Sequence, residues 1–450
     1  MGVVIESSVW EPNPSLFVFI FLACLLSVFL LPYASRSPPP SSVFDHGASL
    51  LHSSRFQRNF LLLYSLCSVM EGLPSVFGEF EFSYFGVSRE QMVLSLCVGF
   101  AASLIVGSFL GVLSDTIGHR KFCLFFCMLH LFVGIWKRIT AHPSVWVGSV
   151  CLSLASSIYS FSFETWMVVE HEKQGHREDL LSDIFWLMAF LGSASFIGSQ
   201  VLTNWLIGDN VKDRITSPSM AAVLLALVGV ICVAQLWKES SQQEVFEDYG
   251  RSYTYFFEDR RILLLACAQA CLHFSISMFW ILWTPILVAD GRELHLGLIY
   301  PCLLGARMLG STIFPWLISG SLSFRTEDCI LYAFIISGFV LSVVAYDYQE
   351  IGVLVTLFCL FQACVGVILP SLARLRTMYV PNDSRGGMIS FSLAPANAAV
   401  LLFLVQGGYY RSISNAAIMA FAAIGLFAAA GCMHVLKQLG KQPYQHLRKL

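Results

Sequence analysis

The sequence predicts an all-α polytopic membrane protein. Only 12% of its 450 residues are charged and 56% are apolar, whereas a soluble globular protein carries about 25% charged residues. Thirteen apolar stretches are each close to the roughly 20 residues that a membrane-spanning helix needs. Six of them lie on each side of a polar segment at residues 237–261. This arrangement predicts two pseudo-symmetric halves of six helices, preceded by one extra helix.

The extra N-terminal helix is expected from about Ser15 to Tyr33. Its N-terminal flank contains Glu6 and Glu11 but no basic residue, so it lacks the basic region of a signal peptide. We therefore expect an uncleaved helix, with a cleaved one as the alternative. The Ser/Pro-rich segment at residues 35–55 follows, and its composition is typical of a semi-rigid, unpacked linker.

The twelve core helices divide the chain into expected parts. Residues 1–54 form the N-terminal helix and linker, 55–237 the first half and 238–260 a cytoplasmic central loop, while 261–437 form the second half and 438–450 a cytoplasmic tail. The helices are centred near residues 66, 101, 130, 154, 194, 228, 275, 307, 336, 360, 397 and 425.

The orientation of the core follows from its basic residues, because Lys and Arg near span ends favour the cytoplasmic side. If the linker is cytoplasmic, nineteen of the 27 Lys and Arg residues lie on that side and seven on the other, with Arg307 inside a span. Both ends of the twelve-helix core are therefore expected in the cytoplasm.

The composition excludes several other classes of protein. A net charge of −2 gives no reason to expect nucleic-acid binding. Most of the fourteen cysteines fall inside apolar stretches, where they behave as small hydrophobic residues. Cys123, Cys127 and His130 share one helical face, but core packing is favoured over a metal site. We expect no metal, no other cofactor, the lipid bilayer as surroundings, and a monomer.

The segment GVLSDTIGHRK at residues 111–121 joins the second and third core spans. Gly111 and Gly118 allow close helix approach and a tight turn. Asp115 supplies an acceptor near helix ends, and Arg120 and Lys121 are basic anchors. The segment resembles the signature G-x-L-x-D-x-x-G-R-K of the major facilitator superfamily, with Thr116 and His119 as departures. The resemblance implies the major facilitator fold and a role for these residues in switching between inward and outward states.

A narrower resemblance is carried by four segments, RFQRNFLLLYSL (55–66), SFETWMVVEHEK (162–173), LLACAQACLHFSISMFWILWTPIL (264–287) and LPSLARLRTMYVPND (369–383). They are similar to the molybdate-anion transporter family, and the likeness runs from about Arg55 to Lys437. It implies uptake of molybdate across the plasma membrane, with an endomembrane as the alternative. It supports an anion substrate more strongly than molybdate itself.

Ionisable groups within spans are costly and usually face the bundle interior or a cavity. Arg307 is near the centre of a span, too deep to reach either interface. A guanidinium offers a planar fork of donors that suits a carboxylate or an oxyanion. Two partners remain open for it, an oxyanion substrate and Glu71 in the first core span. Glu71 is itself a candidate carrier of a coupling proton or, alternatively, a helix-packing residue.

Four further polar residues are candidates for the site. Glu164, near the cytoplasmic end of the fourth span, is assigned to gating or structure ahead of substrate binding. Gln269 and His273 are one turn apart in the seventh span, and Asn397 is in the eleventh. Each of these three is a candidate donor to substrate, with helix packing as the favoured alternative. Arg374 and Arg376 are interpreted mainly as cytoplasmic anchors, with the alternative that one of them reaches into the mouth of the cavity.

Together these residues indicate a secondary active transporter of a small oxyanion. Moving a dianion into a cell costs about 2.3 kcal/mol per charge at 100 mV, or roughly 4.6 kcal/mol. Uphill uptake therefore needs coupled cations, for which protons are the expectation. The alternatives are a porter for a sugar, sulfate or organic anion, and a non-transporting scaffold or sensor. An enzyme is not expected, and no catalytic residue is assigned, because the sequence lacks a nucleophile elbow, a metal cluster and a clear carboxylate pair.

Overall fold

The computed structural model describes residues 47–84, 86–140, 144–173, 178–207, 216–238, 259–289, 294–319, 324–346 and 350–440, with isolated positions between Asn13 and Leu26. Most of the predicted N-terminal helix at Ser15–Tyr33, most of the central loop and most of the tail lie outside these residues. The domain boundaries at 54, 237, 260 and 437 remain predictions.

Each predicted core span coincides with a helix in the described part of the chain. The first half contains α2 (Gly47–Tyr84), α3 (Arg89–Ala102), η1 (Ser103–Gly107), α4 (Ser108–Ile117), α5 (His119–Ile139), α6 (Val145–Lys173), α7 (Glu178–Ile207) and α8 (Thr216–Lys238). The segments α3, η1 and α4 follow one another directly and form the second span.

The second half contains α10 (Arg260–Leu287), α11 (Leu296–Ser319), α12 (Thr326–Ala345), α13 (Ile351–Tyr379), η4 (Asn382–Ser384), α14 (Arg385–Phe403), η5 (Leu404–Tyr409) and α15 (Asn415–Gly440). Here η4, α14 and η5 form a single span. Ten spans within the described residues are long and apolar enough to cross a membrane. The fold class predicted from the sequence, an all-helical polytopic membrane protein, is confirmed.

The first core helix begins within the segment expected to be a linker. The segment at residues 35–55 was expected to be semi-rigid and unpacked, whereas α2 begins at Gly47. The prolines of this segment stop at Pro40, and the following stretch ASLLHSSR contains no helix-breaking residue. Without a proline to remove a hydrogen bond, the first core helix extends back toward the N-terminus.

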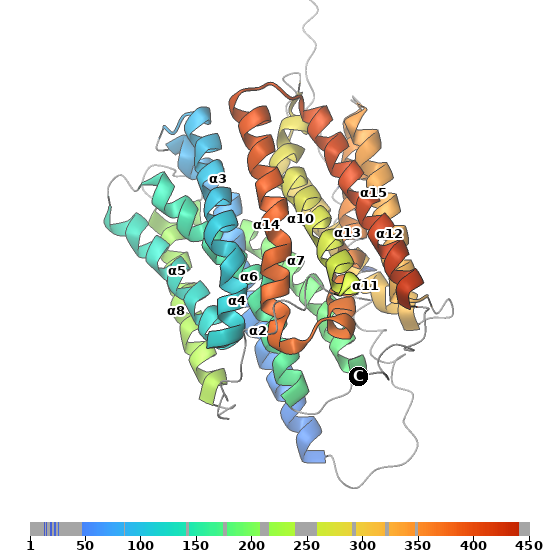
Figure 1. Ribbon diagram of the computed structural model, residues 1–450. Coiled ribbons are helices and arrows are strands. Elements are labelled where there is room, and N and C mark those ends of the chain that lie inside the picture. Colours follow the sequence, from blue (N-terminus) through green and yellow to red (C-terminus); the bar gives the residue numbers. More distant parts are fainter. Residues whose placement is uncertain are drawn as a thin grey trace, which may run out of the picture.

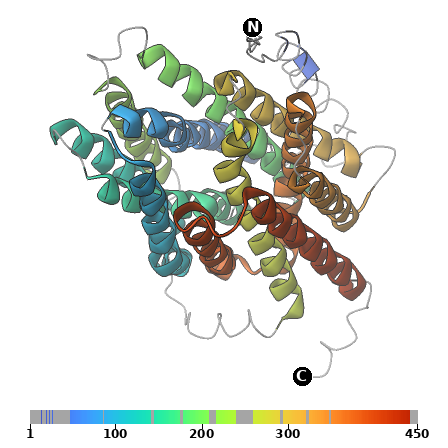
Figure 2. The same cartoon turned by 90° about the horizontal axis from the view of Figure 1, so that it is seen from above.

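The two halves lie side by side in the membrane-spanning bundle (Figures 1 and 2). The helices coloured blue to green form one side in Figure 2, and those coloured yellow to red form the other. Within the first half α2 packs against α7 and α5 against α8, and within the second half α12 packs against α15 and α11 against α13. Contacts between the halves are made mainly by α4 with α14 and by α7 with α11.

Two helices are interrupted by π-helical segments at this boundary between the halves. The segment η1 breaks the second span and contacts α14, while η5 follows α14 and contacts α3. A π segment adds one residue to a helical turn and is frequently found at functional sites. Both π segments therefore belong to the second and eleventh core spans, which contact each other across the boundary between the halves.

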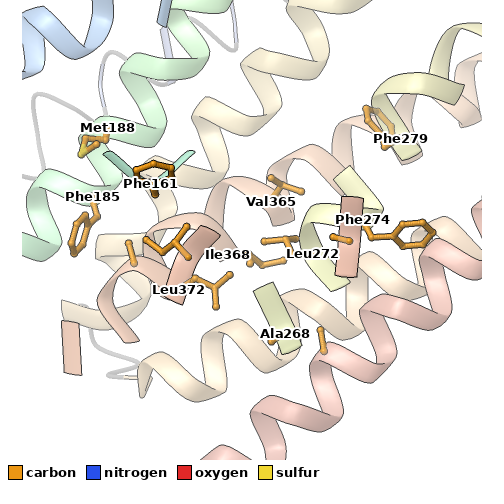
Figure 3. Packing of buried hydrophobic residues seen from close by; sticks show 14 of the residues in the cluster. Phe161, Phe185, Met188, Ala268, Leu272, Phe274, Phe279, Val365, Ile368 and Leu372 are labelled. Carbon is orange, nitrogen blue, oxygen red and sulfur yellow. The ribbon is translucent and has the colours of Figure 1, made fainter. Parts of the chain in front are cut away.

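The interior is packed with aromatic and aliphatic side chains. Val365, Ile368 and Leu372 recur at helical spacing along α13 and belong to the same buried cluster as Ala268 and Leu272 of α10 (Figure 3). This spacing places one face of α13 toward the core. This packing fixes α10 and α13, and polar residues of both helices, such as Gln269 and Arg376, line the cavity described below.

One end of the bundle, which we name the basic end, is where α2 and α10 begin and α15 finishes. It lies at the bottom of Figure 1. Arg261 Nη2 donates to the carbonyl oxygen of Leu439 there, at 3.1 Å, which joins the start of α10 to the end of α15. The predicted cytoplasmic side corresponds to this end.

Candidate transport site

A cavity of about 490 Å³ lies between the two halves. Its walls come from α2, α3, η1, α6 and α7 of the first half and from α10, α11, α13 and α14 of the second. The first, fourth, seventh and tenth core helices (α2, α6, α10 and α13) all contribute to these walls. All five residues predicted to contact substrate lie in its walls, namely Glu71, Gln269, His273, Arg307 and Asn397.

The described lining contains two carboxylates, Glu71 and Glu164, and two guanidinium groups, Arg307 and Arg376. The remaining lining is apolar or neutral, with many serine hydroxyls. When both carboxylates are ionised, the formal charge of the lining is zero with histidine neutral. How these charges are paired therefore decides what the cavity attracts.

Arg307 is bound by a neutral partner. Its Nε and Nη2 donate to Oε1 of Gln362 at 2.9 and 2.7 Å, and its Cζ lies 5.6 Å from the centroid of the Trp280 ring. Among the described residues, no carboxylate forms an ion pair with Arg307. The amide and the ring orient the guanidinium without cancelling its charge.

A close crossing of α11 and α13 holds this arrangement. A Cβ atom added at Gly366 would lie 2.2 Å from the carbonyl oxygen of Arg307, and one added at Gly310 would lie 1.9 Å from that of Ala363. Only glycine permits the two backbones to approach so closely. Gln362 is one turn from Gly366 on α13, so this crossing places its amide beside Arg307.

Glu71 does not pair with Arg307, although the sequence left that pairing open. Its carboxylate Oε2 instead lies 3.4 Å from Nε2 of His130 on α5. His130 is buried, with 3% of its surface exposed, and its Nε2 has no hydrogen bond within ordinary limits. His130 thus faces a cavity carboxylate instead of joining Cys123 and Cys127 in a metal site.

Two stacked tyrosines contribute to the cavity wall formed by the first half. The rings of Tyr64 and Tyr159 stack with centroids 5.6 Å apart, and the Tyr159 hydroxyl lies 2.6 Å from Oγ of Ser68. Both tyrosines line the cavity. Their hydroxyls supply donors that can turn toward a bound polar molecule.

An ion pair joins the two halves at the side of the cavity nearer the basic end. Arg376 of α13 donates from Nε to Oε1 of Glu164 at 2.7 Å and from Nη2 to Oε2 at 2.5 Å. Its Nη1 also donates to Oε1 of Gln269 at 2.9 Å. Glu164 and Gln269 are therefore committed to Arg376 in this conformation, and the positive charge of Arg376 is neutralised.

His273 and Asn397 are the remaining predicted substrate residues. Nε2 of His273 lies 3.3 Å from Oδ1 of Asn397, which joins α10 to α14 across the cavity wall. Asn397 is buried, with 4% of its surface exposed. The contact between the two side chains supports the helix-packing role considered in the sequence analysis. Both side chains nevertheless border the cavity.

The predicted gating segment binds the other half at the basic end. The carboxylate of Asp115 accepts hydrogen bonds from the backbone N–H groups of Gly386 at 3.0 Å and Gly387 at 2.6 Å. These are the first N–H groups of α14, where the helix dipole favours a negative charge. A Cβ atom at Gly111 would lie 2.1 Å from the carbonyl oxygen of Gly386, so glycine is needed for this contact.

The rest of the segment lies at the same end. Gly118 has a φ of 112°, a left-handed conformation that glycine adopts without strain and that separates α4 from α5. Arg120 Nη2 donates to Oε2 of Glu170 at 2.6 Å, and its Cζ lies 5.9 Å from the Trp166 ring. Lys121 is exposed, in agreement with a role as a surface anchor.

A second set of contacts joins the halves at the opposite end. Nε2 of Gln200 on α7 donates to the carbonyl oxygen of Gly297 on α11 at 2.7 Å. Contacts between the halves are thus present on both sides of the cavity, at the basic end and at the opposite end.

Three residues of the site were missed or misread from the sequence. Arg376 was interpreted as an anchor, because a basic residue at a helix end has that meaning in most spans. Gln362 drew no attention since its amide is uncharged. His130 was grouped with two cysteines by spacing alone. One feature of the sequence could have indicated that Arg376 faces inward: it directly follows the apolar Leu375 near the end of a helix.

Comparison with known proteins gives the family. Residues 18–359 match a family of the major facilitator superfamily described as sugar transporters with twelve transmembrane helices. The chain belongs to this family. The superfamily inferred from the 111–121 segment is therefore confirmed, and the protein is a membrane transporter.

The transporter is also similar to curated proteins named molybdate-anion transporters. It is 24% identical to the one from Xenopus tropicalis over 431 residues, which covers 93% of each chain. It is 22% identical to the one from Takifugu rubripes over 424 residues, or 86% of each chain. The narrower resemblance drawn from four segments is confirmed over nearly the whole transporter.

Solved structures support the fold. A crystal structure of a bacterial homologue of the iron transporter ferroportin, in an outward-facing state, superposes with a TM-score of 0.68 at 15% identity. It covers 85% of the transporter and is itself covered completely. A second structure of such a homologue, with soaked iron, gives a TM-score of 0.67 at 14% identity. At these identities the likeness concerns the fold alone.

Proposed function

We propose that this protein is a secondary active transporter that carries a small oxyanion, molybdate in the first place, by alternating access and together with protons. The observation that carries the proposal is the pairing of Arg307 with an amide in place of a carboxylate. A positive charge that is oriented but not neutralised, in a cavity between two halves, favours an anion. The names of the relatives point to molybdate as that anion.

The two sets of contacts between the halves support alternating access. Asp115 with Gly386 and Gly387, and Arg376 with Glu164, join the halves at the basic end. Gln200 with Gly297 joins them at the opposite end. Rocking of one half against the other would break one set while keeping the other, as inverted-repeat transporters do. The plasma membrane, with the basic end in the cytoplasm, is the proposed location.

A sugar is the second candidate, because the matching family is described as sugar transporters. The cavity contains tyrosines and serine hydroxyls that can bind sugar hydroxyls. A neutral sugar leaves the charge of Arg307 uncompensated in a poorly solvated site, which is unfavourable. An oxyanion removes this cost, so it is the better match to the same walls.

Uptake into proteoliposomes tests the proposal. Purified protein is reconstituted, and the uptake of labelled molybdate, sulfate and glucose is compared with and without an inwardly directed proton gradient. We expect molybdate uptake that the gradient stimulates and that Arg307→Leu abolishes, while Arg374→Gln at the basic end retains it. Glucose uptake that Arg307→Leu leaves intact would favour the sugar candidate. Absence of uptake of any oxyanion would contradict the proposal.

A further inference from the structure

We propose that the coupling proton is held between Glu71 and His130, on the wall of the cavity formed by the first half, and not between Glu71 and Arg307. This inference rests on the proposed function and names a residue, His130, that acts with Glu71. It starts from the 3.4 Å separation between Oε2 of Glu71 and Nε2 of His130. A buried histidine nitrogen without a hydrogen bond, directed at a carboxylate, is a place where a proton can be added.

The separation fits an unprotonated pair. A neutral imidazole whose proton is on Nδ1 presents a lone pair at Nε2, and a lone pair forms no hydrogen bond with a carboxylate. When a proton binds to Nε2, the new N–H donates to Oε2 of Glu71. Charge-assisted hydrogen bonds of this kind are shorter and about twice as strong as neutral ones. The two helices α2 and α5 are thereby drawn together when the proton is present.

Access to the pair is one-sided. Glu71 lines the cavity, and 16% of its side chain is exposed, whereas only 3% of the His130 side chain is. Phe126 packs against the histidine ring with centroids 4.6 Å apart. A proton therefore reaches the pair from the cavity side, past Glu71, which is the side from which the anion also enters.

Other titratable groups near the pair do not compete for the proton. Tyr159 of α6 lies close to Glu71, and the thiols of Cys67, Cys127 and Cys232 lie in the same layer of α2, α5 and α8. Phenols and thiols ordinarily titrate above neutral pH, so an imidazole and a carboxylate are better suited to take up a coupling proton. On the α7 side, Phe196 and Ser199 pack at Gly72, and neither side chain titrates in this range. Arg307 borders the same cavity and stays charged.

The charge of the cavity then explains the coupling. With the pair unprotonated, the charges of Glu71, Glu164, Arg307 and Arg376 cancel. One proton on the pair makes the lining net positive, because Arg376 and Glu164 neutralise each other and Glu71 is neutralised by His130. Proton binding and anion binding therefore favour each other, as linkage requires. The proton and the anion need not be in contact, because the charge of the proton changes the electrostatic potential of the whole cavity.

Two transport modes separate coupling from binding. Proteoliposomes are loaded with unlabelled molybdate for exchange at equal pH on both sides, which needs only anion binding and alternating access. In a second set, accumulation of labelled molybdate is driven by an inwardly directed proton gradient. We compare the wild type with Glu71→Gln, His130→Asn and the double variant. His434→Asn, an exposed histidine on α15, serves as the control.

The expected result is selective loss of accumulation. Glu71→Gln and His130→Asn each lower gradient-driven accumulation by about tenfold or more, within the usual range of coupling between two sites. Exchange at equal pH persists in both single variants but no longer depends on pH. The double variant is no worse than either single variant, because the two side chains hold one proton. The control variant behaves as the wild type.

Three outcomes would overturn the inference. Accumulation at the wild-type level in either single variant means that the proton is held elsewhere. Loss of exchange together with accumulation, in variants that remain monodisperse after purification, means that the pair serves binding or packing. If accumulation of molybdate by the wild type does not depend on the proton gradient, transport is not coupled to protons. Absence of molybdate exchange by the wild type would instead show that the proposed function has failed.

Discussion

Glu164 of α6 and Arg376 of α13 form a two-point ion pair between the two halves, with N–O distances of 2.7 and 2.5 Å. Each residue also lines the cavity. The contact that joins the halves near the basic end is thus also part of the inner surface of the cavity. We expect an anion that approaches Arg376 to compete with Glu164 for the same guanidinium, which would link anion binding to opening of this end.

Breaking this pair should destabilise the present conformation. Glu164→Gln leaves the buried charge of Arg376 with a weaker partner, and loss of one member of a buried pair costs about 3–5 kcal/mol. Because Gln269 still accepts from Arg376, we expect the lower end of this range. The check is the midpoint of thermal unfolding in detergent. Glu164→Gln should lower it, and the double variant with Arg376→Gln should recover most of the loss. A double variant as unstable as the single one would contradict the pairing.

Asp115 should control the opening of the basic end. Asp115→Asn replaces one of the two oxygens that accept from Gly386 and Gly387 with an amide nitrogen, which donates and cannot accept. Hydrogen bonds to charged groups contribute about 1.5–3 kcal/mol. Hydrogen–deuterium exchange at the start of α14 should therefore be about tenfold faster or more. Glu90→Gln removes a carboxylate at the opposite end and should leave this exchange unchanged. Unaltered protection in Asp115→Asn would exclude the proposed role.

The close crossing of α11 and α13 should matter for the site as well as for stability. Gly366→Ala places a methyl group 2.2 Å from the Arg307 carbonyl oxygen, and overpacking of this kind costs about 1–3 kcal/mol. The helices must separate, which moves Arg307 from Gln362. We expect a lower unfolding midpoint and weaker molybdate binding. Gly352→Ala on the same helix, where no atom lies within 4 Å of the added methyl, should cause neither effect.

Much of the fold follows from the sequence because bilayer thickness and helix geometry leave few alternatives. The lengths of the apolar stretches predicted the twelve core helices. The free-energy cost of exposing a guanidinium to lipid predicted that Arg307 faces the cavity. The partners of the buried charges were harder to predict. Gln362 meets Arg307 through a helix crossing that depends on Gly310 and Gly366. His130 meets Glu71 between α5 and α2, which are far apart in the sequence. No periodicity within one span carries that information.

The helix ends show the same limit. Arg374 and Arg376 are two residues apart at the end of α13, and basic-residue counting treats them alike. In the structure Arg376 is buried against Glu164 while Arg374 is half-buried without that contact. Which of two neighbouring arginines turns inward is decided by the rotation of the helix against the other half. The sequence of one span does not determine that rotation.

The most direct test of the account is equilibrium binding of labelled molybdate to the purified protein with Gln362→Glu. This isosteric change places a carboxylate against Arg307 and cancels the free charge on which the proposed site depends. We predict that the affinity falls by at least about tenfold, or 1.4 kcal/mol, as it does with Arg307→Gln. Gln438→Glu adds the same charge on exposed α15 and should bind molybdate as the wild type does. Undiminished binding by Gln362→Glu would contradict the assignment of Arg307 as the anion site.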